Sequence, residues 1–188
     1  MAEVKARKKP ASPPTRQARR KKRRRRAALN WARALILALL LGLFLRGFVF
    51  EIVRVQGPSM SETLESGDLV LVTKFDYLFS EPQNGDIVLC AFPGREGRFV
   101  KRVVGTPGDT VSISQGTTTR NGEPVAEPYV TLPAGEDFGP VTLEENQYLV
   151  MGDNRLKSRD SRDPEVGALE EGAFSGRVRF RLWPFEVF

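Results

Sequence analysis

Two side chains of this sequence could carry out chemistry together, the hydroxyl of Ser59 and the amine of Lys101. Ser59 follows Gly57 and Pro58, which end an apolar run and predict a turn that presents the serine after an extended segment. Serine also favours turns for ordinary hydrogen-bonding reasons, so its position alone does not separate a nucleophile from a turn residue.

The chain contains no histidine, which excludes every mechanism that needs an imidazole. A nucleophilic serine must then give its proton to another base, and lysine serves if desolvation leaves it neutral. The single cysteine, Cys90, excludes an intrachain disulfide and cysteine-ligated zinc. It follows three apolar residues, so we interpret it as a small buried side chain. We expect no metal and no cofactor.

The environment of Lys101 decides whether it can act as a base. It lies in an apolar predicted strand, where alternation places it on one face with Phe99 and Val103. Burial of that face would lower the pKa of the lysine by several pH units. An edge strand with the lysine pointing to water is the alternative. Since 42 residues separate Ser59 from Lys101, nothing local shows that they meet.

A second polar stretch, residues 152–163, follows a predicted strand at residues 147–151. It is rich in aspartate and arginine and reads as a loop. Such a loop could be a solvated surface segment. Its charges could equally form a buried network that needs Arg102 as a partner.

The charge of the chain is divided unevenly. Residues 1–26 contain thirteen Lys/Arg and one Glu, a net charge of +12, whereas the remainder has a net charge of −6. Residues 1–27 bury almost nothing and are predicted to be a disordered basic tail. A tail of this kind suits nucleic acid or a membrane surface, and the next segment favours the membrane.

Residues 28–50 are dominated by Ala, Leu, Ile, Gly and Phe, with Trp31 and Arg46 near the two ends. About 20 helical residues are needed to cross the hydrocarbon, so we interpret this segment as a transmembrane anchor. A cleaved signal peptide and a buried core helix are the alternatives. The first would need small residues after the apolar run, where Arg46-Gly47-Phe48 stands instead. The basic flank predicts a cytoplasmic N-terminus and an extracytoplasmic domain over residues 51–188.

The remainder of the chain consists of short β runs separated by turn signals. Asn121-Gly122 predicts a hairpin, and residues 133–146 resemble a surface loop. No long amphipathic helix and no repeat is evident. We therefore predict a mainly β domain in which antiparallel sheet folds into a barrel or sandwich. The predicted strands are residues 48–55, 68–75, 87–92, 98–104, 109–114, 117–120, 123–125, 147–151 and 174–183.

These segments together resemble the bacterial type I signal peptidases, a family with a Ser/Lys dyad. The sequence from Ser59 to Leu64 is similar to the serine box of that family, usually Ser-Met-x-Pro-Thr-Leu, with Glu62 in place of the proline. Four boxes in the family's order, behind one basic-flanked apolar segment, make a specific signal. The other three are Gly85-Asp86-Ile87-Val88, Lys101 to Asp109, and Gly152-Asp153-Asn154-Arg155 with Ser158 and Asp160-Ser161-Arg162.

The resemblance implies a function and a set of site residues. Ser59 would be the nucleophile, Lys101 the general base, and Ser158 a supporting residue that hydrogen-bonds the lysine nitrogen. A structural ion network behind the site would comprise Arg102, Asp153, Asp160 and Arg162. The implied fold is the family's β fold, shared in its core with the LexA-like self-cleaving repressors.

Two departures from the family pattern affect the expected site. Glu62 replaces the proline, which predicts a less rigid turn after the nucleophile. Gly57 stands where some members carry a serine that completes the oxyanion hole, so backbone N–H groups must serve here. Val53 and Val55, on one face of the strand before Ser59, are candidates for lining shallow substrate pockets.

The resemblance also implies partners. The substrates would be secretory preproteins, cut behind their signal peptides, and the chain would sit in the cell membrane as a single-pass protein. The lipid bilayer is then a partner, nucleic acid is not, and association with the translocation machinery is a further expectation. Two alternatives remain at this point: a Ser–Lys self-cleaving regulator, and an anchored β domain that binds peptides or cell-wall material without catalysis.

Overall fold

The computed structural model describes residues 16–133, 135–183 and 185–188. Helix α1 spans Arg16–Phe44, followed by a π-helical turn at Leu45–Val49. The chain divides into two compact units after Phe44, and each is described by itself. The segment Arg26–Val49 is long and apolar enough to cross a membrane, with a mean hydropathy of 2.0. The anchor predicted at residues 28–50 thus coincides with a helix of suitable length and composition, although α1 begins at Arg16, inside the segment that was predicted to be a disordered tail.

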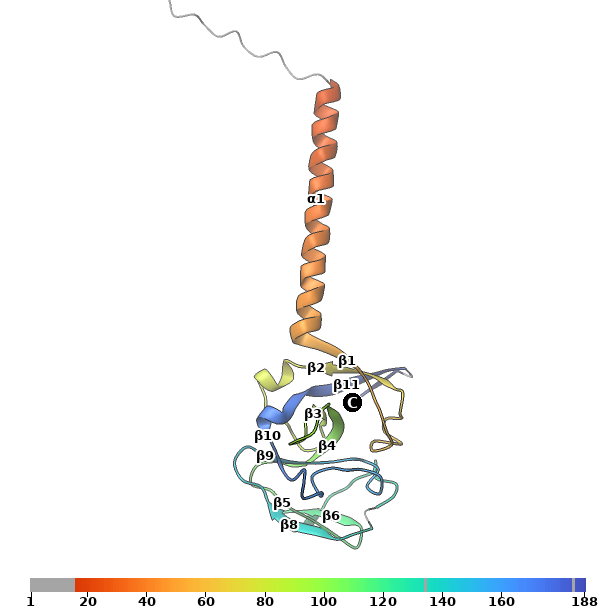
Figure 1. Cartoon of the computed structure of the whole chain (residues 1–188), viewed down its shortest axis with the longest axis vertical. Coiled ribbons are helices and arrows are strands. Elements are labelled where there is room, and N and C mark those ends of the chain that lie inside the picture. Colours follow the sequence, from red (N-terminus) through yellow and green to blue (C-terminus); the bar gives the residue numbers. More distant parts are fainter. Residues whose placement is uncertain (1–15, 134, 184) are drawn as a thin grey trace, which may run out of the picture. The chain divides into compact units, whose positions relative to one another are not determined.

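The second unit is built on an eight-stranded antiparallel sheet, ordered β1-β2-β11-β3-β4-β9-β10 with β12 also paired to β11 (Figure 1). Strand β1 is an edge strand, and β3, near the middle of the sheet, is apolar on both faces. All four residues of β3 are buried, as a strand covered on both sides requires. The strands are β1 Phe50–Arg54, β2 Leu69–Thr73, β3 Ile87–Cys90, β4 Phe99–Gly105, β9 Gln147–Met151, β10 Leu169–Glu170, β11 Phe174–Trp183 and β12 Phe185–Val187.

A smaller antiparallel sheet has the order β7-β6-β5-β8. Asn121 and Gly122 both have positive φ, 56° and 85°, as expected for the predicted hairpin turn between β6 and β7. The strands are β5 Thr110–Ser114, β6 Thr117–Arg120, β7 Glu123–Pro124 and β8 Phe138–Thr142.

Strand β8 corrects the prediction that residues 133–146 form only a surface loop. It pairs with β5 at the edge of the small sheet, and the register shifts between Val111 and Ile113. The sequence did not indicate this strand, because Gly139 and Pro140 within it are residues typical of loops. Proline cannot donate to a central ladder, but an edge strand tolerates it.

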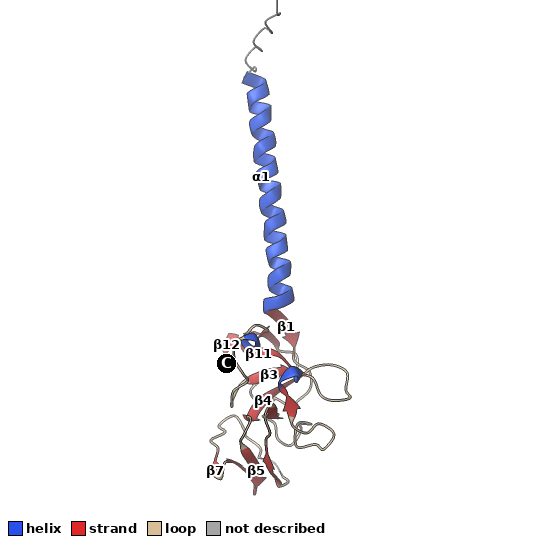
Figure 2. Cartoon of the chain, turned by 90° about the vertical axis from the view of Figure 1, so that its left-hand side faces the viewer, coloured by secondary structure: helices blue, strands red, loops and turns tan. Residues whose placement is uncertain are grey.

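Three clusters of buried side chains fill the second unit. One contains Val55, Met60 and Leu64 together with residues of β2, β3 and β11. A second includes Cys90, as predicted for a small buried residue, and a third joins β4 and β9 to the small sheet. A Cβ at Gly105 would lie 2.7 Å from Val111 of β5, so glycine permits this close approach. The mainly β prediction is therefore confirmed, and outside α1 the described helical turns are short (Figure 2).

Candidate active site

The turn after β1 fixes the backbone of Ser59. Gly57 has φ of +84°, a conformation in which glycine meets no steric penalty. Met60 and Leu64 follow with 1% and 0% exposure, so the turn is anchored by apolar side chains in the core. The amide of Asn154 donates to the Ser59 carbonyl oxygen at 3.1 Å and ties the turn to the loop after β9. Ser59 is thus held at a fixed place beside the sheet.

Lys101 lies in β4 with its side chain only 3% exposed. Its Nζ donates a hydrogen bond to Ser59 Oγ at 2.7 Å and another to the carbonyl oxygen of Val100 at 3.1 Å. The Phe92 ring lies 6.0 Å from Nζ, measured to its centroid. Of the two environments that the strand pattern left open, the buried one is found, and the two residues meet across 42 positions.

Burial lowers the pKa of Lys101 below the ordinary lysine value, because a charged amine is poorly solvated there. The carboxylates of Asp160 and Asp153 act in the opposite direction without reversing the shift. Within the described ranges Lys101 forms no ion pair. Burial also raises the pKa of the Cys90 thiol to about 12, so that neighbour stays uncharged. The site therefore favours a neutral amine next to a hydroxyl.

Two backbone donors beside Ser59 are available to an oxyanion. In the part of the chain that the structure describes, the N–H groups of Ser59 and Met60 have no acceptor. The N–H of Gly57 donates to Ser66 Oγ at 3.2 Å and is already used. The Met60 N–H is therefore a candidate for the second oxyanion donor that sequence reasoning could not name.

A cleft of about 480 Å³ opens beside Ser59 and Lys101, and we call it the Ser59 cleft. Val53 and Val55 are among the residues that line it. Val55 belongs to the buried core, and Val53 is partly buried against it. The residues that line the cleft are 53–56, 59–60 and 96–101.

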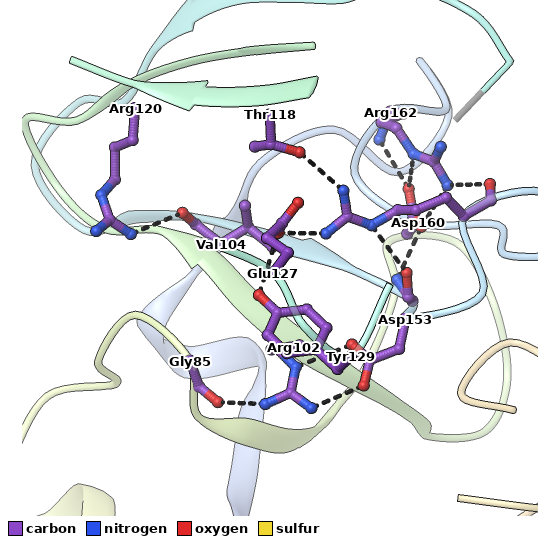
Figure 3. A network of polar contacts seen from close by, with 12 residues as sticks. Gly85, Arg102, Val104, Thr118, Arg120, Glu127, Tyr129, Asp153, Asp160 and Arg162 are labelled. Atoms are coloured by element: carbon purple, nitrogen blue, oxygen red, sulfur yellow. Dashed lines mark hydrogen bonds and ion pairs between the residues drawn. The ribbon is translucent and has the colours of Figure 1, made fainter. Parts of the chain in front are cut away.

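Arg102, the next residue of β4, is held by a carboxylate. Its Nε donates to Asp153 Oδ1 at 2.9 Å, and a terminal nitrogen lies 2.7 Å from Oδ2 (Figure 3). Thr63 Oγ1 also donates to Asp153 at 2.6 Å, and the Tyr129 ring lies 3.8 Å from the guanidinium carbon. Gly85 accepts a further bond from Arg102 at 2.9 Å. This cluster ties the turn that carries Ser59 to β4 and to the loop after β9.

The predicted ion network consists of two ion pairs. The first joins Arg102 to Asp153, as described above. The second joins Arg162 to Asp160, which accepts from Arg162 Nε at 2.8 Å and from the N–H of Gly152 at 2.9 Å. Arg155, which was not among the predicted network residues, links the loop after β9 to Thr118 and Glu127. It is 4% exposed, pairs with Glu127 and donates to Thr118, while its carbonyl accepts from Arg162. No local sequence pattern could have shown this ion pair, because Arg155 and Glu127 are 28 positions apart.

Ser158 departs from the expectation that it hydrogen-bonds Lys101. Its Oγ is buried and has no hydrogen-bond partner among the described residues. A Cβ built on Gly152 would clash with both Ser158 Oγ and the carbonyl oxygen of Ser59. Ser158 therefore packs beside Gly152 and the turn that carries Ser59, and only glycine fits at position 152.

Glu62, which stands in place of the expected proline, has a backbone conformation that the sequence did not predict. Its φ is +79°, a region that a proline ring, fixed near −65°, cannot reach. Its N–H donates to Glu65 Oε1 at 2.9 Å, and its carboxylate accepts from Thr131 Oγ1 at 2.8 Å. The turn is held by hydrogen bonds in a conformation of its own.

A buried amine against a serine hydroxyl, with free N–H groups and a cleft beside them, is suited to acyl transfer without histidine. Residues 28–183 match the family described as "Signal peptidase, peptidase S26". Signal peptidase I T of Bacillus subtilis (strain 168) is 39% identical over 167 residues, covering 84% of this chain and 86% of that protein. Signal peptidase I of Bacillus licheniformis is 38% identical, covering 83% and 89%.

Among solved structures, a signal peptidase I from Enterococcus faecalis V583 is 29% identical, with a TM-score of 0.46. The match covers 52% of this chain and 97% of that one. On the family match and the identity to the Bacillus proteins, the chain belongs to the signal peptidase family and is a serine endopeptidase.

Proposed function

We propose that this protein is a membrane-anchored signal peptidase in which Ser59 is the nucleophile and Lys101 the general base. The observation that carries the proposal is the 2.7 Å contact between Ser59 Oγ and a lysine nitrogen whose side chain is 3% exposed. When the amine is neutral, the same contact lets the serine hydroxyl donate to the nitrogen lone pair. An activated nucleophile needs this reach to its base.

In the proposed reaction, Lys101 takes the proton as Ser59 Oγ attacks the scissile carbonyl carbon. The N–H groups of Ser59 and Met60 stabilise the oxyanion that forms, and one such donor is typically worth roughly 3 kcal/mol. Lys101 then protonates the leaving amine, and water releases the acyl group from Ser59. The buried hydroxyl of Ser158, which has no hydrogen-bond partner in the described part of the chain, would support the dyad from beside the turn.

The substrate would be an extended segment of a secretory preprotein in the Ser59 cleft. Strand β1 is an edge strand, so its outer backbone groups can pair with a peptide. Val53 and Val55 leave shallow space there, which suits small side chains before the bond that is cut. The relatives named signal peptidase I support this choice of substrate.

The proposed organisation is a basic cytoplasmic tail at residues 1–27, an anchor at residues 28–50, and an extracytoplasmic catalytic domain at residues 51–188. The apolar helix over Arg26–Val49 and the preceding run of cations support a cytoplasmic N-terminus in the cell membrane. Residues 1–15 lie outside the described residues. Contact with the translocation machinery would follow from this location.

Purified full-length protein should cleave a secretory preprotein in detergent or bilayers, and Ser59→Ala and Lys101→Ala should each abolish the cleavage. The loss should be at least about 10³-fold, within the range for a missing general base. Ser61→Ala and Lys157→Ala are matched controls, because they remove a nearby serine and an exposed lysine. Processing by either dyad variant at the parent rate would refute the proposal.

A further inference from the structure

Two strand edges face the Ser59 cleft, and they are unpaired there. Strand β1 pairs with β2 on one side only, because it lies at the edge of the large sheet. In β4, Phe99 to Lys101 pair with β3, whereas pairing with β9 begins only at Arg102. The cleft between these two edges ends at Ser59 and Lys101. An extended peptide lying in it could pair with both edges.

An ion pair crosses from one edge to the other, away from the dyad. Arg98, which precedes β4 and lines the Ser59 cleft, donates to both carboxylate oxygens of Glu51 in β1, one of them at 2.9 Å. Glu51 shares a face of β1 with Val53, because side chains two positions apart point the same way. The bidentate geometry fixes the direction of the two side chains as well as their separation.

This pair differs from an ordinary surface ion pair in what it connects. It is the sole hydrogen-bonded contact between β1 and residues 98–101 in the described ranges. Glu51 and Arg98 are 47 positions apart, and their side chains are 22% and 40% exposed. The main cause that lowers the pKa of Glu51 to about 2 is the hydrogen bond from Arg98, so the carboxylate stays charged near neutral pH.

We propose that the Glu51–Arg98 pair is a positioning pair that sets the spacing between the two edges of the Ser59 cleft. This inference rests on the proposed function and adds a determinant of substrate binding to it. With the spacing fixed, an extended segment before the scissile bond can pair along both edges of the cleft. Without the pair, β1 stays paired with β2 but loses its polar link to the residue before β4, so the substrate itself must fix the spacing of the two edges.

The proposal predicts a loss that depends on substrate length. Two peptides with the same cleavage site are compared, one with eight residues before the scissile bond and one with two. For Glu51→Gln or Arg98→Gln in the full-length protein, KM for the long peptide should rise about tenfold with kcat unchanged, as expected for lost uniform binding. KM for the short peptide, which does not reach the pair, should change less than about twofold.

Lys74→Gln is the matched control. Lys74 Nζ also lies 2.9 Å from Glu51, but Lys74 belongs to the β2 side and does not cross the cleft. Its removal should leave both KM values unchanged. In this Lys74→Gln background, Glu51→Arg combined with Arg98→Glu should restore KM for the long peptide, because the pair is rebuilt with its charges exchanged.

Equal changes of KM for both peptides, a fall of kcat instead, or no change at all would overturn the positioning role. A merely structural role would move thermal stability and affect both peptides alike. If the parent protein cleaves neither peptide nor a whole preprotein, the proposed function fails. If the parent cleaves both and the variants behave like it, only the inference about the ion pair fails.

Discussion

Lys101 and Arg102 are neighbours in β4, yet the two cations lie in opposite environments. Lys101 is buried beside Phe92 and a serine hydroxyl, with no carboxylate in hydrogen-bond contact. Arg102 points to the other side of the strand, where Asp153 binds it through two hydrogen bonds. A cation without a partner is driven toward its neutral form, whereas a paired one stays charged. The same strand thereby presents a reactive amine on one face and a structural guanidinium on the other.

Lys101→Met tests the buried side of the strand, because it keeps an apolar chain and removes the amine. We expect hydrolysis of a preprotein to fall by at least about 10³-fold, because the general base is lost. The variant should remain folded, since no buried ion pair is broken. Initial rates and thermal unfolding would be measured together. Activity within tenfold of the parent would contradict a base at position 101.

The parent's pH dependence belongs to the same prediction. The value of kcat/KM should rise with pH as Lys101 loses its proton, with a midpoint below the ordinary lysine pKa of 10.5, because burial lowers it. Between the lowered and the ordinary value the unfolded chain binds more protons than the folded one. Stability due to this group should therefore increase with pH over that window.

Asp153→Ala tests the paired side of the strand. Asp153 is 1% exposed and also accepts from Thr63, so its loss leaves a guanidinium without a counter-ion and a hydroxyl without an acceptor. Removing one partner of a buried pair costs about 3–5 kcal/mol of unfolding free energy. Chemical denaturation would measure it. Glu165→Ala, at an exposed ion pair, is the control and should leave the denaturation midpoint almost unchanged.

Glu62→Pro sharpens the comparison at the turn that joins the two sides. Although proline is the family's usual residue, the φ of +79° at Glu62 is incompatible with its ring. We expect a loss of about 3 kcal/mol, from the forced change of backbone and the missing N–H bond to Glu65. Glu62→Gly accepts the positive φ and should stay within about 1 kcal/mol of the parent. Denaturation showing proline to be the milder change would contradict this account.

Gly152→Ala should lower the free energy of unfolding by about 1–3 kcal/mol, because a Cβ would press on Ser158 and on the Ser59 carbonyl. Its effect on kcat should exceed that of Gly172→Ala, since Gly172 has open space around it. Rates normalised to folded protein would separate the two. Identical kcat values for both variants would show that the Ser59 turn does not depend on this contact.

Much of the fold could be predicted from local patterns. Apolar runs located β2, β3, β4 and β9, and Asn121-Gly122 located a hairpin, because strand period and turn chemistry are local properties. The edge strand β8 was missed, since Gly139 and Pro140 are loop signals unless a neighbouring strand is known to accept them.

The sequence by itself determined which groups could react: without histidine, a serine in this family pattern has only a lysine to serve as its base. Only the tertiary structure decided that Lys101 is buried against Ser59, that Asp153 rather than Asp160 pairs with Arg102, and that Ser158 has no bond to the lysine. The physical reason is that desolvation and pairing depend on neighbours brought together from distant positions. A strand's alternation gives the face on which a side chain lies, and the packing of other strands and loops decides what meets it there.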